Sequence, residues 1–167
     1  MKIIETERVS IHALTLKEDA FIFRLMNSST WLKYIGDRNI RTKEDARNYL
    51  QNGPIKSYEA YGVGMYGVKL KEAQEFIGIC GLVKRDFLDN FDFGYALLPE
   101  YAGKGLAFEA SKAVLDYLAA NRIINRVVAF TTENNGRSLK LLEKLEFQFE
   151  HPFDLHGEEC LLFGRSL

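Results

Sequence analysis

One segment, Phe91 to Ala110 (FDFGYALLPEYAGKGLAFEA), constrains the fold of this chain more than any other. A strand ends there at Pro99, a short loop contains Gly103-Lys104-Gly105, and an apolar helical repeat begins at once. The first N–H groups of a helix have no partner inside the helix, and the helix dipole adds positive potential there. Because glycines let a bulky anion approach these groups closely, the segment indicates a site for a phosphate or diphosphate group.

A Gly-x-Gly turn before a helix also has an ordinary explanation, which is a tight strand-to-helix connection without a ligand. Two phosphate-binding classes are excluded by the surrounding residues. No Gly-Lys-Ser/Thr run follows at the spacing of a Walker loop, and no third glycine follows as a dinucleotide fingerprint requires. An anion that binds at this turn is therefore held neither by a Walker loop nor by a dinucleotide fingerprint.

Strands and helices alternate along the whole chain. We expect strands at residues 9–14, 60–70, 75–85, 91–98, 126–132, 147–153 and 159–165, and helices at 17–26, from 42 to near 53, 105–120 and 138–145. Residues 27–41 show no readable periodicity, and Asn52-Gly53-Pro54 predicts a helix stop. Strand meanders mixed with strand–helix–strand crossovers predict an α/β (α+β) fold with a mixed sheet. Because no repeat or linker interrupts it, we predict one domain over residues 1–167.

Composition excludes several functional classes. The formal net charge is −1, so bulk electrostatic attraction recruits neither nucleic acid nor an anionic membrane. No stretch is long and apolar enough to span a bilayer, and Glu5 and Glu7 stand where a signal peptide has its apolar run. Cys80 and Cys160 lie far apart without metal-ligand spacing, so we expect no disulfide, no metal site and a cytoplasmic location.

Three segments carry a resemblance to a known family. The glycine turn resembles the cofactor motif of the GNAT acetyltransferase superfamily, Arg/Gln-x-x-Gly-x-Gly/Ala, here residues 102–107 (AGKGLA) with Ala102 in the first position. Asn135 to Phe147 (NGRSLKLLEKLEF) is similar to the second cofactor segment, although Glu146 replaces its usual glycine. Thr6 to Ala20 (TERVSIHALTLKEDA) resembles the opening of the branch of ribosomal-protein N-terminal acetyltransferases, the RimJ/RimL-like branch. The chain is therefore identified as a member of this superfamily.

The resemblance implies a mostly antiparallel sheet, splayed between strands 91–98 and 126–132, with helices on both faces. The pantetheine arm of acetyl-coenzyme A (acetyl-CoA), the implied co-substrate, lies in that gap. Backbone groups near Ala96, Leu97 and Leu98 are expected to pair with the arm as with a neighbouring strand, and Asn135 to hydrogen-bond it from the opposite side. The diphosphate is expected to contact the turn formed by Ala102, Gly103, Lys104, Gly105, Leu106 and Ala107.

The implied reaction is direct attack of a neutral primary amine on the thioester carbonyl, with coenzyme A (CoA) as the leaving group. Many relatives protonate the departing thiolate with a tyrosine one turn after the Ser/Ala position of the second segment, and here Leu142 occupies that place. Ser138 is the nearest hydroxyl, so it is the candidate donor, with a helix-start residue as the alternative. Asp92, on the cofactor strand, and Glu133, at the end of the next one, are the candidate bases, with solvated carboxylates as the alternative.

The acceptor is expected to contact Trp31 and Tyr34, which lie where this family closes over its substrate; core packing is their alternative role. The sequence thus predicts an N-acetyltransferase for a protein N-terminus or a small-molecule amine, acting as a monomer or homodimer. Two alternatives stay open. A non-catalytic acyl-CoA sensor on the same fold is suggested by the missing tyrosine, and a nucleotide-binding module would use the glycine turn for another phosphate.

Overall fold

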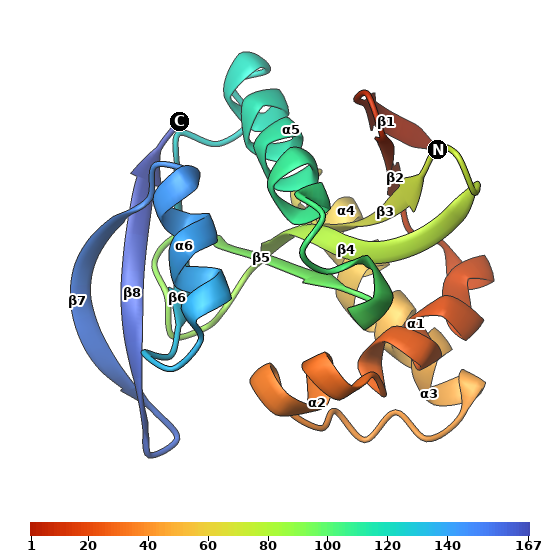
Figure 1. The fold of residues 1–167 in the computed structure, drawn as a ribbon, viewed down its shortest axis with the longest axis horizontal. Coiled ribbons are helices and arrows are strands. Elements are labelled where there is room, and N and C mark those ends of the chain that lie inside the picture. The colour runs from red at the N-terminus through yellow and green to blue at the C-terminus, as the bar shows by residue number, and fades with distance from the viewer.

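The computed structural model describes residues 1–167, and Figure 1 shows how its elements are arranged. The strands are β1 (Lys2–Glu5), β2 (Val9–Ala13), β3 (Met65–Leu70), β4 (Glu75–Val83), β5 (Asp92–Leu97), β6 (Arg126–Thr131), β7 (Gln148–Leu155) and β8 (Glu158–Ser166). The α-helices are α1 (Asp19–Met26), α2 (Ser29–Tyr34), α3 (Lys43–Leu50), α4 (Lys56–Tyr61), α5 (Leu106–Ala120) and α6 (Gly136–Lys144).

All strands join one sheet of eight, in the order β1-β2-β3-β4-β5-β6-β8-β7. Every neighbouring pair is antiparallel except β5 and β6, which are parallel because α5 crosses over between them. The predicted mixed, mostly antiparallel sheet is confirmed.

The sheet is splayed between β5 and β6. Strand β5 is in register with β4 along its whole length, from the Gly78–Leu97 pair to the Val83–Asp92 pair. On its other side, the only register position with β6 is Asp92 opposite Val128, where the Val128 N–H donates to the Phe91 carbonyl at 3.0 Å. Beyond that position the two strands run apart (Figure 1). The predicted gap is therefore present between the two predicted strands.

Helices cover both faces of the sheet, as predicted. One face packs against α5 and α6, whose buried leucines are Leu106, Leu115, Leu118, Leu141 and Leu142, with Leu145 at the C-cap of α6. The other face packs against α1, α2 and α3 through Ile22, Leu25, Met26, Trp31, Ala46 and Leu50. These are two separate hydrophobic cores, and the amphipathic spacing of each helix explains why it packs on one face only. None of the helices has both the length and the apolar character that crossing a membrane requires.

The helix stop predicted at Asn52-Gly53-Pro54 is wrong. The chain continues there through a π-helical turn, Gln51–Ile55, into α4, which ends at Gly62 in the left-handed conformation (φ 72°). Proline has no N–H to donate, and the wider turn accommodates that missing donor within a continuous helical path. As a consequence, the strand predicted from residue 60 begins only at Met65.

Besides α4, two elements were absent from the sequence prediction. Strand β1 pairs antiparallel with β2 at the edge of the sheet, and its few residues are too short to show a periodicity. Helix α2 lies inside the segment without a readable pattern and buries Trp31 in the second core. Both depend on tertiary contacts that local sequence does not report.

The core position of α5 gives a stability prediction. Leu115 is fully buried between α5 and the sheet, so Leu115→Ala should lower the free energy of unfolding by about 2–5 kcal/mol through lost contacts and a cavity. Urea denaturation measures this change in the free energy of unfolding. Leu32→Ala, at an exposed leucine of α2, is the control and should change stability by no more than about 0.5 kcal/mol. Equal losses in the two variants would contradict the packing described here.

Candidate active site

The glycine turn has the geometry of an anion cradle. Gly103 (φ 75°) and Gly105 (φ 77°) are both left-handed, a conformation that side chains disfavour, and Gly105 is the N-cap of α5 without a side-chain cap. The backbone N–H groups of residues 103–108 donate to no acceptor in the protein. Consecutive free N–H groups at a helix N-terminus bind phosphate groups, so the turn fits the diphosphate of CoA.

A polar network fixes this turn to the N-terminal segment. Arg8 donates from Nη1 to the Lys104 carbonyl at 2.8 Å and from Nε to Glu109 Oε2 at 2.6 Å. Glu109 Oε1 also accepts from Thr6 Oγ1 at 2.6 Å and from the Arg8 backbone N–H at 2.8 Å. Partial burial alone would raise the pKa of Glu109, but these hydrogen bonds outweigh it and lower the pKa overall. The start of the segment Thr6 to Ala20, which carries the resemblance, thus holds the glycine turn in place. Sequence reasoning missed this structural role.

The open edge of β5 presents alternate backbone groups to the gap. Leu98 N–H donates to the Ile77 carbonyl at 2.8 Å, so the backbone groups of Leu98, and of Ala96 two residues earlier, point toward β4. Those of Leu97 and Tyr95 therefore point toward β6, where the strands have separated. The expectation that Ala96 and Leu98 pair with a ligand through their backbone is wrong for this reason; Leu97 fits it.

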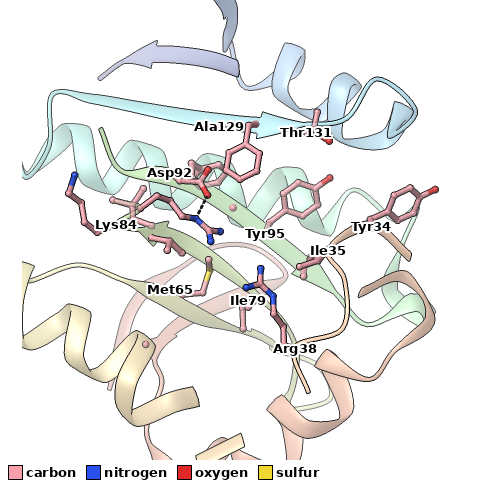
Figure 2. A pocket seen from close by; sticks show the side chains of 18 of the residues that line it. Tyr34, Ile35, Arg38, Met65, Ile79, Lys84, Asp92, Tyr95, Ala129 and Thr131 are labelled. Carbon is pink, nitrogen blue, oxygen red and sulfur yellow. Dashed lines mark hydrogen bonds and ion pairs between the residues drawn. The ribbon is translucent and has the colours of Figure 1, made fainter. Parts of the chain in front are cut away.

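A cavity of about 970 Å³ opens beside the gap, and 20 of its 38 lining residues are hydrophobic. Figure 2 shows side chains from β4, β5, β6 and the α2 region converging on it. Of the predicted site residues, those that line it are Trp31, Tyr34, Asp92, Ala96, Asn135 and Ser138. Leu97, Leu98, Glu133 and the turn at residues 102–107 are not part of the lining.

Tyr95 and Ser138 meet across the gap. Tyr95 Oη and Ser138 Oγ are 3.1 Å apart, joining β5 to α6. Burial raises the pKa of Tyr95, which keeps the phenol protonated and able to donate. Leu142, where relatives carry a tyrosine, is buried in the core that α6 covers. Sequence reasoning missed this contact, because nothing in the spacing of two residues 43 apart indicates it.

Asn135 begins helix α6. Its Oδ1 accepts from the Ser138 N–H at 3.3 Å, so Asn135 is the N-cap and the helix starts at Gly136 rather than at Ser138. The Asn135 side-chain NH₂ donates to no protein group, which leaves it available to the cavity that it lines. Its predicted contact with the pantetheine arm stays a prediction.

Asp92 is a buried carboxylate at the point where β5 and β6 separate. It is 5% exposed, lines the cavity and forms an ion pair with Arg85, whose Nε lies 3.2 Å from Oδ2 (Figure 2). Burial raises the pKa of Asp92 to about 7, although Arg85 opposes the shift. A carboxylate that titrates near neutrality is suited to take a proton from an amine. Glu133 is exposed and lies outside the cavity, so its role as a base stays a prediction without geometric support.

The two aromatic residues predicted to contact the acceptor lie at different depths. Trp31 is 6% exposed, within the core of α1, α2 and α3, and its Nε1 has no hydrogen-bond partner. Tyr34 lies at the end of the same helix and its ring is exposed beside the cavity (Figure 2). Both line the cavity. Trp31 has its alternative role in core packing, and contact of either ring with the acceptor stays a prediction.

A splayed sheet, an anion cradle that follows β5 and a buried carboxylate at the start of β5 fit the class of CoA-dependent acyltransferases. The sequence matches the family described as acetyltransferase (GNAT) domain over residues 8–148. The chain therefore belongs to the GNAT acetyltransferase family, as predicted.

Two curated relatives and one solved structure illustrate this membership. The chain is 28% identical to the uncharacterized N-acetyltransferase p20 of Bacillus licheniformis, covering 90% of this chain and 84% of that protein. It is 27% identical to the spermine/spermidine N(1)-acetyltransferase of Bacillus subtilis, covering 92% and 97%. The structure of RimL, the ribosomal L7/L12 alpha-N-protein acetyltransferase in complex with CoA, superposes with a TM-score of 0.85 at 17% identity, covering 100% and 98%. The predicted likeness to the RimJ/RimL branch is thus confirmed in the fold.

The anion cradle gives a binding prediction. Gly103→Val places a branched side chain beside the free N–H groups, in space that is open within 4 Å, and should weaken acetyl-CoA binding by about tenfold or more, or about 1.4 kcal/mol. Isothermal titration calorimetry measures the affinity. Gly157→Val is the control, because Gly157 in the β7–β8 turn is also left-handed (φ 86°) with open space around it. If the two variants bind acetyl-CoA equally well, the diphosphate does not lie at this turn.

Proposed function

We propose that this protein is an acetyl-CoA-dependent N-acetyltransferase that transfers the acetyl group to a primary amine, on a protein N-terminus or a small molecule. The observation that carries the proposal is the free N–H array of residues 103–108 beside a strand gap that ends at Asp92. Membership in the GNAT family supports it, as do relatives named for acetylation of spermine and spermidine and of a ribosomal protein α-amine.

The cofactor is proposed to bind along the face of the sheet that α5 and α6 cover. The N–H groups of residues 103–107 bind the diphosphate, and the backbone of Tyr95 and Leu97 pairs with the pantetheine arm in the gap. Asn135 keeps its cap with Oδ1 and donates to the arm with its free NH₂ group. The thioester then lies where β5 and β6 diverge, near Ser138.

The acceptor amine is proposed to approach from the opposite face. Asp92 takes the proton from the attacking amine, directly or through a water molecule. When the C–S bond breaks, its electron pair goes to sulfur. Ser138 donates a hydrogen bond to this developing thiolate and receives one from Tyr95.

A second candidate function is a sensor that binds acyl-CoA without turnover, which the leucine at position 142 suggested. The hydroxyl pair of Tyr95 and Ser138 supplies the missing donor and favours the enzyme. Release of free CoA from acetyl-CoA in the presence of a broad amine panel, followed with a thiol reagent, separates the two functions. Binding without release would support the sensor. Cytoplasmic location and oligomeric state stay predictions.

The raised pKa of Asp92 predicts a pH dependence. The base acts when it is deprotonated, so kcat/KM should rise with pH through about 7, the folded-state pKa of Asp92. An α-amine acceptor loses its own proton near pH 7.7–8.0, so log kcat/KM should rise with a slope of about two below pH 7. Asp92→Asn should reduce that slope to about one and lower kcat by roughly 10²–10⁴. An unchanged slope in the variant would assign the base elsewhere.

The contact between the Tyr95 and Ser138 hydroxyl groups predicts coupled losses of kcat when either group is removed. Ser138→Ala should lower kcat by roughly ten- to a hundredfold, about 1.4–2.7 kcal/mol, with little change in acetyl-CoA binding. Tyr95→Phe removes only the phenol oxygen and should cause a smaller loss in kcat, because it acts through Ser138. In the double variant the losses should not add. Full turnover in Ser138→Ala, with chemistry rate-limiting, would leave Ser138 as a structural residue of α6.

A further inference from the structure

Exposed apolar side chains gather at the mouth of the cavity. Tyr34, Ile35, Tyr61 and Phe87 are each 40–52% exposed, and all four line the cavity. They come from three distant segments: the end of α2, the end of α4 and the β4–β5 loop. Exposed apolar side chains that converge on a concave site mark a ligand surface. This rim is not needed for folding, since the two cores are formed without it.

Aromatic contacts hold part of the rim in place. The Phe87 ring lies 6.1 Å from that of Phe130 and 6.3 Å from that of Phe153, and Phe130 and Phe153 form an edge-to-face pair at 5.5 Å. Tyr61 packs edge-to-face on Phe91 at 5.4 Å. Such clusters position a ring without burying its outer face. An apolar group placed in the cavity therefore meets a preformed surface.

The charges of the cavity do not favour a polycation. Its carboxylates are Asp37, Asp86, Asp92 and Glu158, and its cations are Arg38, Lys56, Lys84 and Arg85. Two of the carboxylates are already paired, Asp37 with Arg41 and Asp92 with Arg85. Arg38 has no ion-pair partner and points toward the strands of the pocket (Figure 2). A chain of ammonium groups would thus meet unpaired positive charge as well as negative.

We propose that the acceptor is an α-amine that carries an apolar side chain and no second positive charge. This inference rests on the proposed function and specifies its substrate class. The amine nitrogen lies toward Asp92, and the side chain packs against the part of the rim that Phe87 forms. Burial of such a side chain supplies binding free energy in proportion to the apolar area removed from water.

The test compares amines with the same reactive group. Phenylalanine amide and glycine amide both present an α-amine and differ in the apolar side chain, and spermidine represents a polycation. With acetyl-CoA as donor and CoA release as readout, kcat/KM should be at least tenfold higher for phenylalanine amide than for glycine amide, and lowest for spermidine. Equal values for the two amides, or preference for spermidine, would overturn the inference alone. If none of the three amines causes CoA release, the inference is overturned, and the broad amine panel decides whether the proposed function fails as well.

A matched pair of variants locates the apolar subsite. Phe87→Ala should lower kcat/KM for phenylalanine amide by about tenfold and leave that for glycine amide unchanged. Phe149→Ala is the control, because Phe149 is a phenylalanine of similar exposure on β7 that does not line the cavity. A loss for both amides in Phe87→Ala, or an equal loss in Phe149→Ala, would contradict a side-chain subsite at the rim.

Discussion

The two halves of the sheet are joined across its centre at a single register position, where Val128 donates to the carbonyl of Phe91. From there on, β5 and β6 cannot satisfy each other's peptide groups. A buried peptide group without a partner costs about 1–3 kcal/mol, so the gap retains hydrogen-bonding capacity of the kind that an extended ligand satisfies in the proposed function. The backbone of Tyr95 and Leu97, the cavity and the position of Asp92 all follow from this divergence.

Successive side chains of β5 point to opposite faces of the sheet, so residues with different proposed roles lie on different faces. Tyr95 packs with the core under α5 and α6, and Ala96 with the core under α1, α2 and α3. Asp92 is four residues before Ala96, so it shares that second face. The proposed thiolate donor and the proposed amine base are thereby placed on opposite sides of one strand. Each side is covered by its own helices, which lets cofactor and acceptor enter separately.

Much of this arrangement follows from sequence pattern, and the exceptions have physical causes. The glycine turn, the long periodicity of α5 and the β-branched run of β6 are local signals, so the fold and the cradle were predictable. The helix stop predicted at Pro54 was wrong because a π turn accommodates proline inside a helical path. The direction of the Leu98 N–H depends on pairing with β4, and the Tyr95–Ser138 contact depends on the crossover. Neither has a signature in neighbouring residues.

The network of Thr6, Arg8 and Glu109 places a carboxylate in the first turn of α5, the helix proposed to bind the diphosphate. A bare carboxylate there would repel a diphosphate, and Arg8 cancels that repulsion while it holds the Lys104 carbonyl. Closure of the N-terminal segment onto α5 and occupancy of the turn are therefore thermodynamically linked. Each increases the population of the other by the same factor, so binding of an anion at the turn favours the contact between Arg8 and Lys104, which are 96 residues apart in the chain.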